Sequence, residues 1–165
     1  MATTTDAAVA AASTPVPSGA VLLRPGDGTQ MTLMGNDLEL ILRADRSPRF
    51  AIVDYKVGPR FVAPPVLHHH VEDDWAGYVL EGTLTFVFSD RTEAAHAGDV
   101  IFVPRRTPFA WRNDADAPAR FLAIYAPAGF ESYFDDIAAA LAGGGTALTP
   151  EILAPLWARH GVANS

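Results

Sequence analysis

Short apolar runs, broken by Gly, Pro, Asp and Asn, fill the chain between residues 21 and 127. This pattern is typical of all-β sandwiches and barrels, whose short strands are joined by tight turns. Thr83–Phe88 alternates clearly, with Leu84, Phe86 and Phe88 on one face, as in a strand with one side in a core. The runs predict strands at Val21–Leu23, Gln30–Met34, Leu38–Arg43, Phe50–Val57, Val66–His70, Trp75–Leu80, Thr83–Phe88, Val100–Val103, Phe109–Asn113 and Arg120–Tyr125.

Beyond the last of these strands the apolar residues recur at helical spacing. They predict a first helix over Phe130–Leu141 that ends at Gly143–Gly145. A second helix is predicted to begin with Thr149 as its N-cap and Pro150 at its first position, and to end at Gly161. We interpret the apolar stripe of each helix as a packing surface against the barrel or against a second subunit.

Length and composition indicate one main folding unit. With 165 residues, of which 49% are hydrophobic and 19% charged, the chain has an ordinary globular composition and can bury a core of its own. We expect a flexible tail over residues 1–19, a barrel over 20–127 and a helical extension over 128–165. The tail lacks a basic n-region, so we do not expect a secretory signal, and no apolar segment approaches the roughly 18 residues that span a bilayer.

Charge and cysteine content exclude several classes of function. The net charge of −7 and the pI of about 5.0 argue against a nucleic-acid or membrane partner, since such partners require clustered basic residues. The absence of cysteine excludes disulfides, thiolate metal ligands and a thiol nucleophile. It is also typical of a reducing compartment, and we therefore expect a cytoplasmic protein.

The candidate chemistry gathers in the stretch from Gly58 to Gly82. Three consecutive histidines, His68, His69 and His70, follow two prolines that favour an extended backbone. On a strand, His68 and His70 point the same way, about 6 to 7 Å apart along the chain, while His69 points to the opposite face. Two imidazoles at this spacing can converge on one ion or one substrate.

These residues, together with the stretch 98–113, resemble the two sequence motifs of the cupin superfamily. The first motif has the form G-x5-H-x-H-x3,4-E-x6-G, and the second has the form G-x5-P-x-G-x2-H-x3-N. The resemblance implies an all-β fold, a cupin jelly-roll β-barrel, followed here by two C-terminal α-helices. The matching positions are His68, His70 and Gly82 for the first motif, and Gly98, Pro104 and Asn113 for the second.

The usual metal site of the family, three histidines and one glutamate, is incomplete in this sequence. Counting from Pro104 and Asn113 puts Phe109 at the third histidine position. Counting back from Gly82 puts Trp75 at the glutamate position. Two histidines alone would hold a d-block ion weakly, because stable sites use three or four protein ligands.

A second alignment gives the carboxylate role to Asp74 and absorbs one extra residue near Gly77 as a β-bulge. His68, His70 and Asp74 would then form a set of two histidines and one carboxylate for one divalent transition metal, Fe, Mn, Ni or Zn. Without metal, His68 or His70 would serve as a general base tuned by Asp74. We interpret Glu72–Asp73 as solvated loop acids. The sequence leaves both alternatives, one metal ion or none, open.

Aromatic residues at the two altered motif positions indicate the kind of ligand. If Trp75 and Phe109 point into the barrel, they add aromatic surface beside the histidines, with Tyr78, Trp111 and Tyr125 as further candidates for substrate binding. Such a cavity favours a flat, apolar or aromatic small molecule.

The resemblance implies an enzyme that acts on this small molecule inside the barrel. With metal it would carry out oxygenase-like chemistry, similar to the quercetin-dioxygenase branch, and without metal an isomerase-like or cyclase-like proton transfer. The alternative is a cupin that binds a small molecule without catalysis. Cupins that resemble this chain often form homodimers that bury their edge strands, so we also expect a homodimer.

Overall fold

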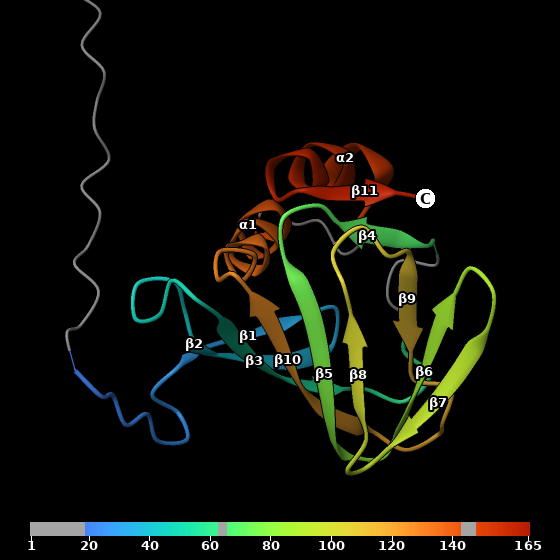
Figure 1. Cartoon of the computed structure of the whole chain (residues 1–165), viewed down its shortest axis with the longest axis horizontal. Coiled ribbons are helices and arrows are strands. Elements are labelled where there is room, and N and C mark those ends of the chain that lie inside the picture. The colour runs from blue at the N-terminus through green and yellow to red at the C-terminus, as the bar shows by residue number, and fades with distance from the viewer. Residues whose placement is uncertain (1–18, 63–65, 143–147) are drawn as a thin grey trace, which may run out of the picture.

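The computed structural model of the chain describes residues 19–62, 66–142 and 148–165 (Figure 1). Strands make up most of the regular structure, and two helices lie near the C-terminus. The strands are β1 (Thr29–Leu33), β2 (Asn36–Leu42), β3 (Ala51–Val57), β4 (His68–His70), β5 (Asp74–Glu81), β6 (Thr83–Phe88), β7 (Thr92–His96), β8 (Val100–Val103), β9 (Phe109–Arg112), β10 (Ala119–Ala126) and β11 (Val162–Asn164). The helices are α1 (Ser132–Leu141) and α2 (Pro150–Arg159).

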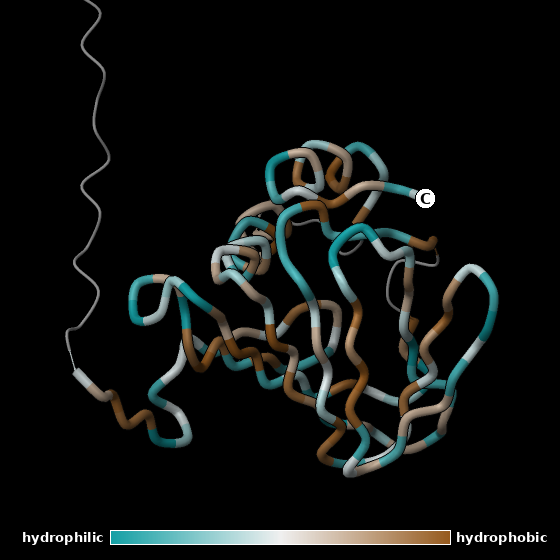
Figure 2. Tube along the Cα trace, viewed as in Figure 1, coloured by the Kyte–Doolittle hydropathy of each residue, from teal (hydrophilic) through white to brown (hydrophobic). Residues whose placement is uncertain are grey.

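The strands form two antiparallel sheets that enclose the core. One sheet has the order β1-β2-β3-β10-β5-β8, and the other has the order β11-β4-β9-β6-β7. Inward-facing residues alternate along the central strands, so that Val53, Phe86 and Phe121 are almost completely buried. Figure 2 shows the hydrophobic residues concentrated along the strands and hydrophilic residues at many of the turns. The predicted all-β barrel with two C-terminal helices is confirmed.

Most predicted strands are observed with ends shifted by one or two residues, but two sequence interpretations need correction. The strand predicted at Val21–Leu23 is wrong, because these residues lie outside both sheets and Leu22 is 75% exposed. Strand β7 was not predicted, because its sequence TEAAH buries only Ala95 and so shows no clear alternation.

Asn113, which matches the second motif, stabilises a turn. It is almost fully buried, and its side-chain amide donates to the carbonyl oxygens of Gly58 and Ala117. Its Oδ1 accepts a hydrogen bond from the backbone N–H of Ala115. Asn113 therefore joins the turn before β10 to the segment that follows β3.

The C-terminal extension is more than a pair of helices. Thr149 is the N-cap of α2, as predicted, and Pro150 is the first helical residue. After α2 the chain forms β11, a strand that was not predicted and that pairs with β4. The extension therefore adds an edge strand to the histidine-bearing sheet, and both helices lie at that end of the barrel (Figure 1). Neither described helix is long and apolar enough to cross a membrane.

Two sequence predictions concern residues outside the described ranges. These are the flexible tail, apart from residue 19, and the end of the first helix at Gly143–Gly145.

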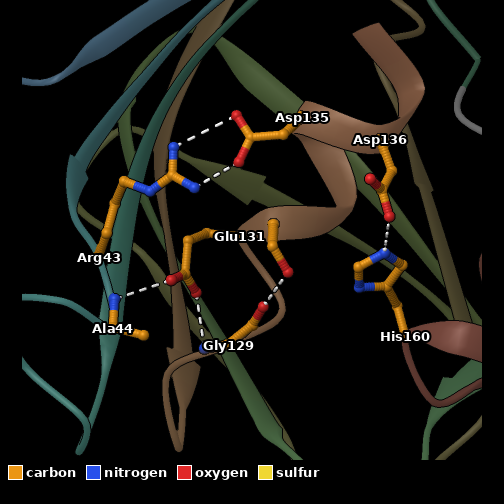
Figure 3. A network of polar contacts seen from close by, with 8 residues as sticks. Arg43, Ala44, Gly129, Glu131, Asp135, Asp136 and His160 are labelled. Atoms are coloured by element: carbon orange, nitrogen blue, oxygen red, sulfur yellow. Dashed lines mark hydrogen bonds and ion pairs between the residues drawn. The ribbon is translucent and has the colours of Figure 1, made fainter. Parts of the chain in front are cut away.

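A buried carboxylate, that of Glu131, fixes the start of α1 (Figure 3). Its two oxygens accept hydrogen bonds from the backbone N–H groups of Ala44, at 2.8 Å, and Gly129, at 2.7 Å. One turn further on, Asp135 forms an ion pair with Arg43, on the segment that follows β2. Since Glu131 is only 2% exposed, its bonds are protected from competition by water.

Replacing Glu131 with Ala should destabilise the protein by roughly 1–3 kcal/mol, because two backbone donors lose their acceptor in a buried place. The Asp135→Ala variant is the matched control. It removes an ion pair that is partly exposed to solvent, and it should cost less than about 1 kcal/mol. Urea unfolding followed by circular dichroism measures both. Equal losses in the two variants would contradict the special role of Glu131.

Candidate functional site

An aromatic cavity of about 80 Å³ lies at the end of the barrel that carries the helices. Both sheets contribute to its wall, and so do α1 and α2. The residues proposed from sequence that line it are His68 and His70 from β4, Trp75 from β5, Phe109 and Trp111 from β9, and Tyr125 from β10.

Tyr78 does not line the cavity. Alternation along β5 directs Trp75, Gly77 and Val79 inward, so that Asp74 and Tyr78 face outward, and Tyr78 is 39% exposed. The proposed substrate contact from Tyr78 is therefore not found in the structure.

Trp75 is held firmly in the cavity wall. It is 2% exposed, and its indole packs against Phe109, with ring centroids 5.2 Å apart, and against Phe86, at 5.7 Å. The indole also folds over Gly77, where an added Cβ would meet the ring at 2.5 Å. Gly77 therefore provides the space for this bulky side chain.

Asp74 lies away from the histidine pair, and its carboxylate is held by Arg105. The Arg105 guanidinium donates to both oxygens at 3.0 Å, and the backbone N–H of Arg105 donates at 2.9 Å. These bonds lower the pKa of Asp74 to about 2. The register of β5 against β10 shifts between Val79 and Glu81, which places the bulge at Leu80 and leaves Gly77 in regular pairing. The structure therefore does not assemble His68, His70 and Asp74 into one set.

Asp73, rather than Asp74, is the carboxylate that lies beside a histidine of the pair. Its Oδ2 lies 2.8 Å from His70 Nδ1, and both side chains are about 5% exposed. The interpretation of Asp73 as a solvated loop acid is wrong, because the short turn between β4 and β5 folds its side chain back onto His70. Because an ionised carboxylate only accepts hydrogen bonds, a neutral His70 paired with one would carry its proton on Nδ1 and leave the lone pair on Nε2.

His68 has a different environment from His70. Its ring packs between Phe109, at 5.0 Å, and Trp157 of α2, at 5.9 Å between centroids. Its Nδ1 is buried and has no hydrogen-bond partner of good geometry among the described residues, and a weak backbone contact with Val66 only partly opposes the fall in its pKa. Burial, with a further contribution from the nearby His70, lowers the pKa of His68 to about 4, so this imidazole is neutral at physiological pH.

His69 points away from both of its neighbours, and its Nδ1 lies 2.8 Å from Ser165 Oγ at the C-terminal end of the chain. His68 and His70 face the cavity and His69 faces outward, which is the alternation expected of a strand.

The cavity has few polar groups. None of the described residues that line it is Lys, Arg, Asp or Glu. Tyr55 and Tyr125 contribute hydroxyl groups, and burial raises the pKa of both side chains, so they remain protonated. A neutral ligand with an aromatic surface and a few polar groups would match this lining.

Comparison with known proteins identifies the barrel. The sequence profile described as "Cupin domain" matches residues 53–125, which include most of β3, all of β4 to β9 and most of β10. The barrel is a cupin domain. No curated protein sequence matches the chain.

Solved cupin-like structures share the fold with this chain at low sequence identity. KdgF from Halomonas sp. is 15% identical, with a TM-score of 0.59 over 67% of this chain and 96% of that one. The polyketide cyclase RemF from Streptomyces resistomycificus is 24% identical, with a TM-score of 0.55 over 66% and 80%. The Streptomyces protein Pac13, described as a nucleoside dehydratase, is 19% identical, with a TM-score of 0.55 over 69% and 88%. At these identities the likeness establishes the fold alone.

Cupins often bind metal, but the residues of this cupin do not fit a resident metal ion. The expected ligand set is reduced to His68 and His70, because buried Phe109 and Trp75 occupy the other two positions. Within the three described ranges of the chain, no three His, Cys, Asp or Glu side chains gather as a metal site. Two imidazoles are fewer than the three or four protein ligands of stable transition-metal sites.

Protein prepared without a His-tag and incubated with Fe, Mn, Ni or Zn should retain well under one metal ion per chain after desalting. Phe109→His restores a third histidine beside His68, so that variant should retain more metal. Elemental analysis measures both samples. One ion per native chain that disappears in His68→Ala/His70→Ala would contradict this prediction.

Folding stability should fall as the pH is lowered from about 6.5 to 4. In this range the unfolded chain binds a proton at residue 68 while the folded chain, with the pKa of His68 at about 4, does not. The loss should be on the order of 3 kcal/mol in full, and it should be absent above pH 6.5.

The His68→Phe variant keeps an aromatic ring against Trp157 but cannot titrate. Its stability should therefore depend less on pH across this window, as measured by urea unfolding at several pH values. The same pH dependence in both proteins would show that other groups cause the effect.

Proposed function

We propose that this cupin is a metal-independent enzyme that transfers a proton on a small, uncharged, aromatic or apolar molecule. The observation that supports it most is the buried pair of His70 and Asp73, with 2.8 Å between His70 Nδ1 and Asp73 Oδ2. An imidazole oriented by a carboxylate, with its second nitrogen facing an apolar cavity, is the usual arrangement of a general base.

The proposed step requires no oxidant and no second substrate. His70 Nε2 takes a proton from an acidic C–H bond of the substrate, and the electron pair of that bond moves into an adjacent carbonyl. Asp73 stabilises the imidazolium that forms. In an isomerisation the proton then returns from Nε2 to the far carbon of a double bond conjugated with the enolate. In a cyclisation the enolate carbon bonds to a second carbonyl carbon of the same molecule, the π bond of that carbonyl breaks, and the proton returns from Nε2 to the alkoxide that forms.

His68 serves in binding under this proposal. Its lowered pKa makes it a weak base that competes poorly with His70 for the substrate proton, and its buried Nδ1 can pair with a polar group of the ligand. Such a pairing would remove the cost of an unpaired buried polar atom, roughly 1–3 kcal/mol.

Structural neighbours give this proposal limited support. The polyketide cyclase and the nucleoside dehydratase are both named as enzymes that act on small organic molecules. They illustrate that a barrel of this kind can house such chemistry, although the low identity does not transfer a substrate. Oxygenase-like chemistry is not part of the proposal, because it would need metal ligands that the described residues do not supply.

The second candidate function is ligand binding without catalysis. It is favoured by the small cavity of about 80 Å³ and by the aromatic rings at two of the four family ligand positions.

The expected homodimer stays a prediction of its own, and the exposed apolar residues Tyr78, Val100 and Phe102 on the outer face of β5 and β8 support it.

His70→Ala should lower the rate of proton exchange on a carbon acid by about 10²–10⁴-fold, because the general base is lost. Asp73→Asn should lower it by roughly 10-fold or more, since an amide can donate to Nδ1 and leave Nε2 protonated. Deuterium uptake from D2O by a panel of aryl ketones and polycyclic phenols, followed by NMR, measures the rate.

Asp74→Asn is the matched control and should stay within about twofold of the native rate, because Asp74 faces outward toward Arg105. If the native protein binds these compounds but exchanges no proton, the second candidate function replaces the first.

A further inference from the structure

A second hollow lies outside the barrel, beside the aromatic cavity. It is a groove of about 510 Å³ between the turn before β5, the segment before α1, and the end of α2. Charged side chains line it, among them Asp73, Asp136, Arg159 and His160. Among the described residues, Phe130 is the one that lines both the groove and the cavity.

The Phe130 ring stands directly against the proposed catalytic histidine. Its centroid lies 4.3 Å from that of His70 and 4.8 Å from that of Tyr125, on which it stacks. It also contacts His160, at 6.4 Å, on the side of the groove. The ring is therefore the partition between the two spaces.

The backbone around Phe130 is held in place, so that the passage of a molecule between the groove and the cavity depends on the Phe130 side chain. Gly129, the preceding residue, has a φ of +135°, which other residues rarely adopt. Its N–H is bound by the buried carboxylate of Glu131, the following residue, which also binds Ala44 (Figure 3). A rotation of the Phe130 side chain connects the spaces without moving this anchored turn.

The two volumes indicate why such a connection matters. Ligand sites usually measure roughly 300–1,000 Å³, and the cavity of about 80 Å³ is well below this range. The groove of about 510 Å³ has a partly apolar wall that also carries charged groups, with Asp136 held by Arg159 at 2.9 Å and by His160 at 2.7 Å. A molecule with an apolar planar head and a polar extension would match the two spaces in turn.

We propose that Phe130 is the gate between the cavity and the groove, and that it determines how long a molecule the site accepts. The head of the substrate lies in the cavity beside His70, and its hydroxylated extension lies in the groove. The substrate part of this inference rests on the proposed function, whereas the gate itself is a property of the fold.

The tryptophans of the chain make the gate measurable without a substrate. There are three, Trp75, Trp111 and Trp157, and all of them line the cavity. Quenching of the intrinsic fluorescence by acrylamide therefore reports how easily a small neutral molecule enters. Phe130→Ala should raise the quenching constant by roughly twofold or more, and Phe130→Leu should raise it by less.

Phe134→Ala is the matched control. Phe134 is another phenylalanine of the cavity wall, four residues further on, but it does not line the groove. Its truncation enlarges the cavity without opening the partition, so quenching should rise much less. Equal quenching in Phe130→Ala and Phe134→Ala, or no change in either Phe130 variant while both remain folded by circular dichroism, would overturn the gate.

Two probes of different length test the effect on specificity. Phe130→Ala should bind a three-ring flavonol roughly tenfold more tightly than the native protein, and it should bind 2-naphthol with little change. Equal changes for both probes would overturn the assignment of length selection to Phe130. Neither assay depends on catalysis, so a gate that opens in a protein without proton exchange would refute the proposed reaction and leave the gate standing.

Discussion

The pairing of β11 with β4 is the contact on which the candidate site depends. Strand β4 has three residues, and on its other side it meets β9 only where His68 faces Phe109. The C-terminal strand completes it, with Val162 opposite His70 and Asn164 opposite His68. Because both histidines are then part of a continuous sheet, their side chains are directed inward by the pleat rather than by a loop.

His68 and His70 have identical side chains but different surroundings. His70 lies beside the turn into β5 and has Asp73 as its partner, whereas His68 lies against Trp157 of α2 and has none at Nδ1. Burial penalises the charged form of His68 and lowers its pKa. The proposed division of work, with His70 as the base and His68 as a binding residue, thus follows from which part of the chain covers each ring.

Local sequence predicted the barrel well and the site only in part. Alternation in Thr83–Phe88 and the spacing of His68 and His70 depend on neighbouring residues, and both were read correctly from the chain. The sequence interpretation gives the histidines Asp74 as a partner, whereas the structure gives His70 the adjacent Asp73. The choice between these two acids depends on how a short turn folds. The sequence predicts only packing surfaces for the C-terminal extension, because the contact of Phe130 and Trp157 with the cavity arises from the tertiary position of that extension.

The packing of Trp75 over Gly77 has a consequence for metal binding at the site. A carboxylate at position 75 would not fill the space that the indole occupies above Gly77, and Phe109 would still block the third histidine position. Each single replacement toward the metal-binding pattern, Trp75→Glu or Phe109→His, leaves a void or an unpaired polar group in the core. A four-ligand metal site therefore requires both positions to change together, along with the packing around them.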